Sequence, residues 1–362
     1  MTQKQTEKLA NRHKTSISPR TPVYPTMSVM KNLELILPFS IAPAGLEKDL
    51  LKAMETPSLA KLIATANTTL LMTGEAFSKA LAHEYLLAGD LSNIDFSNSP
   101  ATAWDTMQSK GITPQSGFWF SLQPIHIHFA RDHLVLMDQR RLQITNEESR
   151  QLFDIAKTVC DEFKMELMFG DSLTWFLRCD SWSGLKTATI DAACGHNIDI
   201  WMAQGEHARA WRKLQNEIQM LWFSHPINQQ REENGQLTVN SVWLSCGAGK
   251  PSKGTKAIMN HVSKGDVTND LSSPIETSSI VLDALMGPAM NSDWSYWLEQ
   301  MHSLEKDYFT PLLQALQKNE LQELKLICSD ARQIVQFKLT PWSVRKFWVK
   351  PSLSKLFAVK AV

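Results

Sequence analysis

Cysteine is scarce in this chain, and its cysteines are not paired in the sequence. The 362 residues include five cysteines at scattered positions, and no two of them form a C-x-x-C pair. An odd, scattered set of this kind argues against a zinc ribbon or a disulfide scaffold and is typical of reduced thiols. We therefore expect a cytoplasmic protein.

Net charge and long apolar runs are also absent. Basic residues and acidic residues both number 37, so the formal net charge is zero. A neutral chain argues against bulk electrostatic binding to nucleic acid or membrane, although such a chain can still carry local charged patches. No apolar run approaches the roughly 20 residues that cross a bilayer. We expect no membrane partner, and the partner that remains is a small ligand or a protein.

Two further signatures are missing. Residues 1–30 are polar and lack the apolar segment of a secretory signal, so we interpret them as a disordered N-terminal extension. The run Gly247-Ala248-Gly249-Lys250 lacks the spacing of the G-x-x-x-x-G-K-[ST] phosphate loop. The second absence argues against a nucleoside triphosphatase.

What is present predicts an α/β protein. The composition is 43% hydrophobic, which at this length supports one large domain or two small ones. The run from Asn32 to Ser40 is a short apolar strand that ends at a proline turn, the usual opening of an α/β domain. We predict a single α/β domain over residues 31–362, with a mixed sheet and flanking helices. The polar, lysine-containing composition further predicts a mobile loop at about residues 250–273.

Polar side chains gather among apolar ones in residues 216–249. Apolar residues recur at three- and four-residue steps from Trp211 to Trp222, which predicts an amphipathic helix. Pro226 should end this helix and place His225 at its exit.

The charge of Glu217 is unusual in this helix. The residue follows Leu214 by three positions and precedes Leu221 by four, so its carboxylate should emerge inside the apolar stripe. A buried carboxylate costs several kcal/mol unless it is paired. We expect a partner, and the candidates are Arg231, His225 or an asparagine amide.

The expected polar network consists of five side chains: Glu217, His225, Asn228, Arg231 and Asn240. One interpretation is a buried network that fixes the packing of the loop on the helix, because such networks must be satisfied wherever they occur. The other interpretation is a small-ligand site at the helix exit. The residues alone leave both interpretations open.

A second cluster could bind a metal. In an extended chain His126 and His128 point to the same face, and Asp132 and His133 follow, which makes a divalent-metal half-site conceivable. The alternative is a pair of histidines on the solvated face of an antiparallel strand. We favour this alternative because no D-x-x-x-H or H-E-x-x-H motif occurs elsewhere.

The C-terminal region mixes basic and aromatic residues: Trp342, Arg345, Lys346, Phe347, Trp348 and Lys350. Such a mixture is typical of nucleic-acid or phosphate-binding patches. An aromatic edge that caps the core explains the same residues, and we favour that interpretation.

Several short motifs occur along the chain: P-x-H at Pro124–His126, R-D-H at Arg131–His133, the helix start at Glu148-Ser149, N-E-x-Q-M at Asn216–Met220, H-P-x-N at His225–Asn228 and N-S-x-W at Asn240–Trp243. Together they resemble one bacterial family, the regulatory proteins of the RpfE type, some members of which carry the name cofactor-independent phosphoglycerate mutase. The likeness covers most of residues 31–350.

The mutase name implies a relation to the alkaline-phosphatase-like fold, whose enzymes use two metal ions and a Ser or Thr nucleophile. The run from Thr56 to Leu62 is similar to the T-P-x-L-x-x-L helix of that superfamily, and Ser40 lies where a nucleophile would sit. The ligand motifs D-x-x-x-H-x-x-D and D-H-G are missing. His126 matches the family's P-x-H, whereas His128 matches no family position.

Together these observations predict a cytoplasmic protein that regulates or binds a ligand rather than one that clearly catalyses a reaction. The alternative is a metal-dependent phosphoryl-transfer enzyme, a phosphomutase or phosphatase, with Glu217 and the residues around His126 near a divalent metal. A weaker alternative is nucleic-acid association through the basic C-terminal segment.

Overall fold

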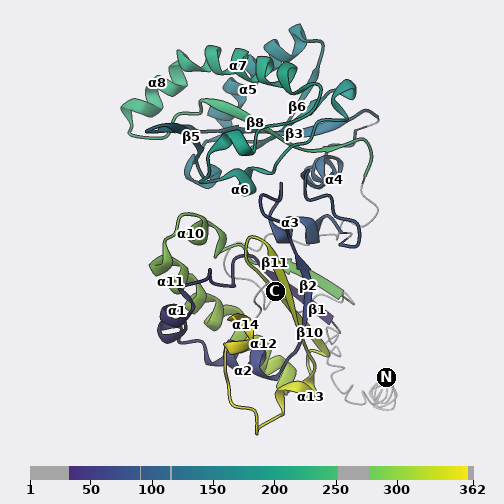
Figure 1. Cartoon of the computed structure of the whole chain (residues 1–362), viewed down its shortest axis with the longest axis vertical. Coiled ribbons are helices and arrows are strands. Elements are labelled where there is room, and N and C mark those ends of the chain that lie inside the picture. Colours follow the sequence, from purple (N-terminus) through teal and green to yellow (C-terminus); the bar gives the residue numbers. More distant parts are fainter. Residues whose placement is uncertain (1–31, 90, 115, 252–276, 358–362) are drawn as a thin grey trace, which may run out of the picture.

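The computed structural model describes residues 32–89, 91–114, 116–251 and 277–357. It has two lobes, each built around its own sheet (Figure 1). The expected disordered extension at residues 1–30 and nearly all of the expected loop at 250–273 lie outside the described residues. The predicted fold class is confirmed, since helices flank a mixed sheet. That residues 31–362 form a single domain stays a prediction.

The first lobe contains a five-stranded sheet in the order β2-β11-β10-β1-β9. The interior strand β1, which lies between β10 and the edge strand β9, is parallel to both of these neighbours, while β11 is antiparallel to β10 and β2. The strands are β1 (Asn32–Leu37), β2 (Asn67–Thr73), β9 (Thr277–Val281), β10 (Glu323–Ser329) and β11 (Gln333–Leu339). The strand predicted from Asn32 is therefore confirmed, and its almost continuous burial is that of an interior parallel strand.

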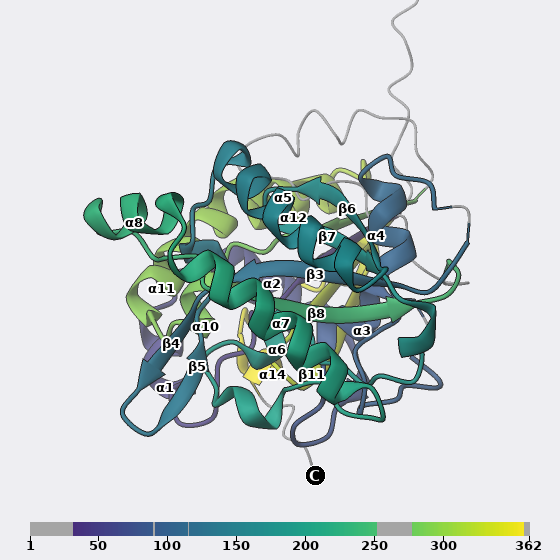
Figure 2. The same cartoon turned by 90° about the horizontal axis from the view of Figure 1, so that it is seen from above.

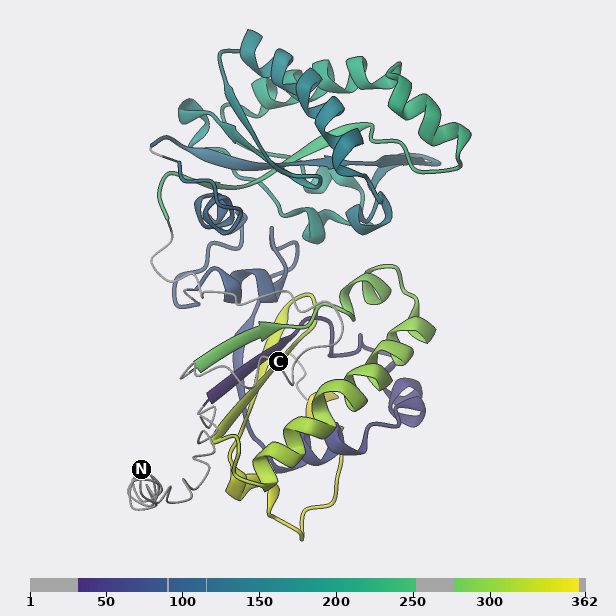
Figure 3. The ribbon, with the colours of Figure 1, turned by 180° about the vertical axis from the view of Figure 1, so that it is seen from behind.

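Helices cover both faces of this sheet. The larger core lies on one face, where Trp297 and Phe309 pack against strand residues such as Leu35; Figure 3 shows its helices from behind. These helices are α1 (Glu47–Ala53), α2 (Pro57–Thr65), α10 (Met286–Met290), α11 (Trp294–Leu304), the π-helical turn η4 (Glu305–Phe309), α12 (Thr310–Gln317), α13 (Pro341–Val344) and α14 (Ser354–Phe357). On the other face α3 (Ala82–Leu87) buries Tyr85 and Leu86.

The second lobe is inserted in the sequence between β2 and β9. Its sheet is antiparallel, in the order β6-β7-β3-β8. The strands are β3 (Trp119–Ile125), β6 (Glu166–Asp171), β7 (Thr174–Arg178) and β8 (Ser241–Ala248), and a separate hairpin is formed by β4 (Ile127–Ala130) and β5 (His133–Leu136).

Two long helices lie across one face of this second sheet (Figure 2). They are α5 (Asn146–Glu162), which begins with a capping box between Thr145 and Glu148, and α7 (Ala208–Phe223). The shorter helices are α4 (Ala103–Ser109), α6 (Ile190–Ala193) and α8 (Pro226–Glu233), and the 3-10 turns are η1 (Gln139–Arg141), η2 (Asp180–Trp182) and η3 (Ile198–Ile200). The predicted helix from Trp211 to Trp222 is confirmed as α7, and Pro226 begins the next helix.

The interpretation of the C-terminal aromatic segment as a cap of the core is wrong. Trp342, Phe347 and Trp348 are 77%, 89% and 68% exposed. The residues that cover the core in this region are the small and aliphatic ones, such as Pro341 and Val344. The described helices include none that is long and apolar enough to traverse a bilayer.

Candidate functional site

Arg231 is the centre of the polar network that follows α7. Its side chain is 1% exposed. Its guanidinium donates to the carbonyl of Leu237 over 2.7 Å, to the carboxylate of Glu148 over 2.7 Å and to the carbonyl of Leu142. Burial works against ionisation of Glu148, yet hydrogen bonds from Thr145 and Arg231 hold its pKa below the usual range. The buried cation is therefore paired, and its donors are used within the chain.

Two asparagines of the predicted network bind backbone groups. The Asn228 side chain accepts from the Val239 amide over 2.8 Å and donates to the carbonyls of Trp222 and Val239, each over 2.9 Å. Asn240 accepts from the Ile127 amide over 2.8 Å and donates to the Ile127 carbonyl over 2.9 Å. Each of the two side-chain amides binds a backbone N–H and a backbone carbonyl, as a neighbouring strand would. These bonds hold the chain in place before β8, which favours the structural interpretation of this network.

The prediction of a buried Glu217 paired with this network is wrong. Glu217 is exposed, and the carboxylate beside Arg231 belongs to Glu148. The error comes from Leu221, which is 50% exposed and does not belong to the buried stripe. The buried residues of α7 are Trp211, Leu214, Gln215, Ile218 and Trp222. At about 100° per residue, Glu217 lies well outside their arc.

His225 lies at the helix exit, as predicted. It is the N-cap of α8, and its Nδ1 accepts from the Ile227 amide over 3.3 Å. Burial lowers the pKa of His225, so the neutral ring that this cap requires is favoured.

The predicted metal residues are divided between two places. The His126 Nδ1 lies 2.8 Å from the carbonyl of Thr238, and the His126 and His128 rings stack with their centroids 6.5 Å apart. Asp132 and His133 bind each other over 2.8 Å at the turn of the β4-β5 hairpin. Throughout the described part of the chain, no three His, Cys, Asp or Glu side chains gather as a metal site would require.

Ser40 is buried behind the end of β1. Its hydroxyl donates to the carbonyl of Leu37 over 2.7 Å. In this position it closes the turn after the strand, and its oxygen does not face an open pocket as a nucleophile would.

A cleft of about 740 Å³ lies between the lobes, next to the Arg231 network. Its volume is within the range of about 300–1,000 Å³ that is typical of small-molecule sites. Two of its walls come from the second lobe, at residues 138–143 and 235–237, and the third comes from α10 and α11 of the first lobe. Because Arg231 binds the carbonyls of both Leu142 and Leu237, it ties two of the three walls together.

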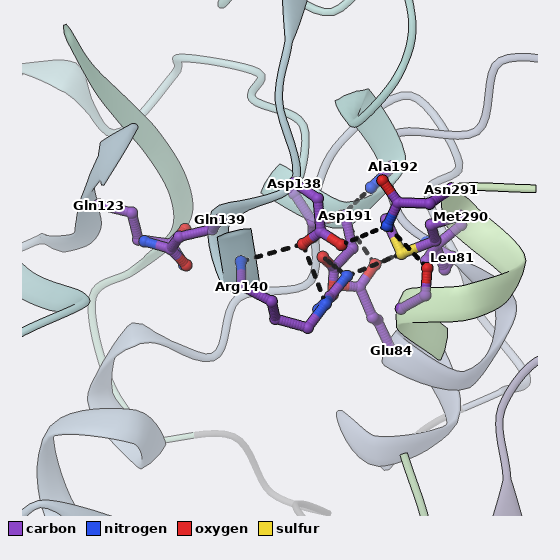
Figure 4. A network of polar contacts seen from close by, with 12 residues as sticks. Leu81, Glu84, Gln123, Asp138, Gln139, Arg140, Asp191, Ala192, Met290 and Asn291 are labelled. Atoms are coloured by element: carbon purple, nitrogen blue, oxygen red, sulfur yellow. Dashed lines mark hydrogen bonds and ion pairs between the residues drawn. The ribbon is translucent and has the colours of Figure 1, made fainter. Parts of the chain in front are cut away.

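Arg140 is fixed at the edge of the cleft by carboxylates (Figure 4). Its guanidinium lies 3.0 Å from Asp138 and 3.0 Å from Asp191. Burial opposes the charge, but these two carboxylates raise the pKa of Arg140. Asn291, the C-cap of α10, donates to the other oxygen of Asp138 over 2.9 Å, so this ion-pair cluster also connects the two lobes.

Glu84 lies beside the same cluster, on α3 (Figure 4). Its carboxyl group accepts from the Leu81 amide over 2.6 Å and from the Thr189 hydroxyl over 2.7 Å. Burial and the neighbouring carboxylate of Asp191 raise the pKa of Glu84 to about 8. The group is therefore largely protonated at neutral pH, which limits the negative charge at this edge of the cleft.

Arg141 differs from its neighbour. It lines the cleft, its backbone amide donates to the Asp138 carbonyl, and its side chain is exposed and makes no hydrogen bond or ion pair with the residues that the structure describes. Across the cleft Tyr296 is also exposed, while Asp293 uses its side chain to cap α11. The cleft thus presents a guanidinium that no described residue binds, opposite a phenol.

A second pocket, of about 820 Å³, lies at the carboxyl ends of β1 and β10. Ligands commonly bind at such ends in open α/β sheets. Its two carboxylates hold the surrounding loops: Glu47 accepts from the Gly45 amide, and Asp330 accepts from the amides of the two residues that follow Ala331. The interlobe cleft differs from this pocket in that both lobes contribute to its walls.

The residues of the cleft are missed by the sequence patterns. Asp138 to Arg141 reads D-Q-R-R one residue after the short, mostly unburied strand β5, and the two adjacent arginines are a local signal for an anion site. The wall from α10 and α11 lies about 150 positions further along the chain and carries no motif that would link it to them.

The chain matches no protein-family model and no curated protein. Among solved structures it is similar to the cofactor-independent phosphoglycerate mutase from Thermoplasma acidophilum, with 12% identity over 86% of this chain and 90% of that chain and a TM-score of 0.35. It is also similar to the PH0037 protein from Pyrococcus horikoshii, with 11% identity over 86% and 87% of the two chains and a TM-score of 0.48. Likenesses of this size assign no activity, and the RpfE-type resemblance stays a prediction.

Proposed function

We propose that this protein binds a small anionic ligand, with a carboxylate or phosphate group, in the cleft between its lobes. The observation that carries the proposal is the exposed guanidinium of Arg141, which has no ion-pair partner among the described residues, in a cleft of ligand size. A guanidinium binds carboxylate or phosphate through two parallel hydrogen bonds, which supplies both affinity and orientation. Arg140 beside it is already held by Asp138 and Asp191, so Arg141 is the free partner.

The position of the cleft supports a regulatory role. A ligand held by Arg141 and reaching Tyr296 would touch both lobes. Such a ligand binds one arrangement of the lobes better than others and shifts the population toward it. The resemblance to RpfE-type regulatory proteins supports the same role, and five free cysteines support a cytoplasmic location.

The runner-up, metal-dependent phosphoryl transfer, finds less support. His126 binds a backbone carbonyl, His133 binds Asp132 and His128 stacks on His126, and in the described residues these side chains belong to no group of three metal ligands. Ser40 is buried and bonded to the backbone. We therefore rank ligand binding first.

The melting temperature of the full chain tests the proposal. It is measured at fixed ionic strength with inorganic phosphate, with citrate, and with glycerol as an uncharged control. A ligand at about 100 times its Kd stabilises the folded state by about 2.7 kcal/mol, so an anion that binds should raise the melting temperature where glycerol does not. If neither anion raises it, or if Arg141→Ala responds as the wild type does, the proposal fails.

A further inference from the structure

Three exposed aromatic side chains stand close together after β11. Trp342, Phe347 and Trp348 fall within seven residues, and Figure 1 shows this part of the chain, in yellow beyond α13, at the end of the first lobe farthest from the second. Trp342 belongs to α13, and the other two follow it. Phe347 and Trp348 are in ring contact, and exposed aromatic rings gathered in one short segment are typical of an interaction surface.

The segment is held in place by the body of the lobe. The Lys61 ammonium, on α2, donates to the carbonyl of Lys346 over 2.8 Å and to that of Val349 over 3.3 Å. The amide of Ser352 donates to the carbonyl of Ala60 over 3.1 Å. The aromatic side chains are therefore presented by a backbone that is tied to α2 at several points.

The charge of this segment has one sign. Arg345, Lys346 and Lys350 lie among the aromatic residues, and no Asp or Glu occurs from Pro341 to Phe357. The Arg345 guanidinium lies over the Trp342 ring, 5.6 Å from its centroid, and donates to the Asn319 side chain over 3.0 Å. The complementary partner is therefore anionic and able to accept aromatic rings.

We propose that residues 341–350, the aromatic-basic segment, dock on the surface of an anionic lipid bilayer. Aromatic side chains insert at the level of the lipid headgroups, and Lys or Arg beside them is attracted to anionic lipids. The proposal does not depend on the cleft. It differs from the expectation of no membrane partner, which was drawn from the net charge and from the lack of a spanning run, because the basic charge is local.

The ring geometry favours lipid over single-stranded nucleic acid. Bases stack on open faces of aromatic rings. Here one face of Trp342 is covered by Arg345, and Phe347 and Trp348 pack edge to face with centroids 5.1 Å apart and planes at 86°. Insertion among headgroups needs exposed apolar volume, which these rings retain, rather than open parallel faces.

Cosedimentation of the full chain with lipid vesicles tests the proposal. One set of vesicles is phosphatidylcholine alone, and the other contains phosphatidylserine as well. We expect binding to the second set only, a shift of tryptophan emission to shorter wavelength on binding, and weaker binding at high salt. The double variant Phe347→Ala, Trp348→Ala should bind about tenfold more weakly. Phe223→Ala, which removes an exposed phenylalanine from α7 of the other lobe, should bind as the wild type does.

Three outcomes would overturn the proposal. One is the absence of binding to either vesicle set by a folded chain. Another is equal binding by the double variant. The third is that the double variant binds a single-stranded oligonucleotide less well, or self-associates less, while its vesicle binding is unchanged, since the surface would then serve nucleic acid or a second copy. Circular dichroism and melting of each variant show that the exposed substitutions leave the fold intact.

Discussion

The buried guanidinium of Arg231 lies 2.7 Å from the carboxylate of Glu148, which is itself the third residue of α5 and closes its capping box. The same guanidinium binds the carbonyls of Leu142 and Leu237, which line the cleft. One side chain thus joins the start of a core helix to two walls of the proposed site. Arg231 is a positioning residue for the cleft rather than a ligand of its contents.

Replacing Arg231 should destabilise the protein strongly. Arg231→Ala leaves Glu148 without its charge partner and two backbone carbonyls without donors, and we expect a loss of about 3 kcal/mol in the free energy of unfolding. Urea denaturation measures this loss. Glu217→Gln is the matched control, because Glu217 is exposed and its replacement should change stability by less than about 0.5 kcal/mol. If Glu217→Gln lowers the free energy of unfolding strongly and Arg231→Ala lowers it little, the prediction of a buried Glu217 would be right and the present assignment wrong.

The ion pair between Arg231 and Glu148 should also make the stability of the fold depend on pH. The pKa of Glu148 is depressed in the folded state, so its contribution is fully present above the unfolded-state value of about 4.5 and is lost as the pH falls through the lower folded value. Glu148→Gln should be less stable than the wild type at neutral pH, and the difference should shrink below about pH 4. A difference that is independent of pH would contradict this assignment.

The pH dependence of stability that Glu84 contributes should have the opposite sign to that of Glu148. Its pKa is raised to about 8 in the folded state, so the folded state holds its proton more tightly than the unfolded chain does. Its contribution is most favourable below the unfolded-state pKa and decreases as the pH rises toward 8. Glu84→Gln stays neutral, so its stability relative to the wild type should increase between pH 5 and pH 8.5, roughly the interval between the two pKa values. Parallel stability curves for the two proteins would show that Glu84 titrates normally.

Metal removal should leave the protein unchanged. His126 and His128 contact backbone or each other, and His133 contacts Asp132. We expect a chain purified without a histidine tag to melt at the same temperature before and after chelation. About one or two equivalents of zinc, manganese or iron per chain, by elemental analysis, would instead revive phosphoryl transfer and justify His126→Ala and His128→Ala as the next variants.

Local patterns in the sequence carried much of the fold. The apolar run at Asn32 predicts a strand that the structure contains, and the capping box that the structure shows at Thr145 and Glu148 is a sequence signal of the same kind, because both act within a few residues. The helix α7 was also predictable, but its buried arc was not. Leu221 fits the period of the stripe and is nevertheless exposed, because the sheet and α5 decide which side of α7 is covered.

The cleft could not be predicted in this way. Arg141 and Tyr296 are brought to the same cleft by the insertion of one lobe into the sequence of the other, and no periodicity records that topology. Arg231 was named in the sequence as a candidate partner for a buried carboxylate, but the carboxylate that it pairs with, Glu148, lies 83 positions away. Hydrogen-bonding capacity is visible in a sequence, but the partner that uses it depends on tertiary structure.

The most direct test of the account is a calorimetric titration of inorganic phosphate and of citrate into the wild type, Arg141→Ala and Arg212→Ala. Arg212 is an exposed arginine on α7 and serves as the matched control for loss of one positive charge. We predict saturable binding of at least one anion to the wild type and to Arg212→Ala, and binding about tenfold or more weaker to a folded Arg141→Ala, since a charge-assisted hydrogen bond contributes about 1.5–3 kcal/mol. Equal affinity of all three proteins, or no binding by the wild type, would contradict the central claim that the interlobe cleft is an anion site.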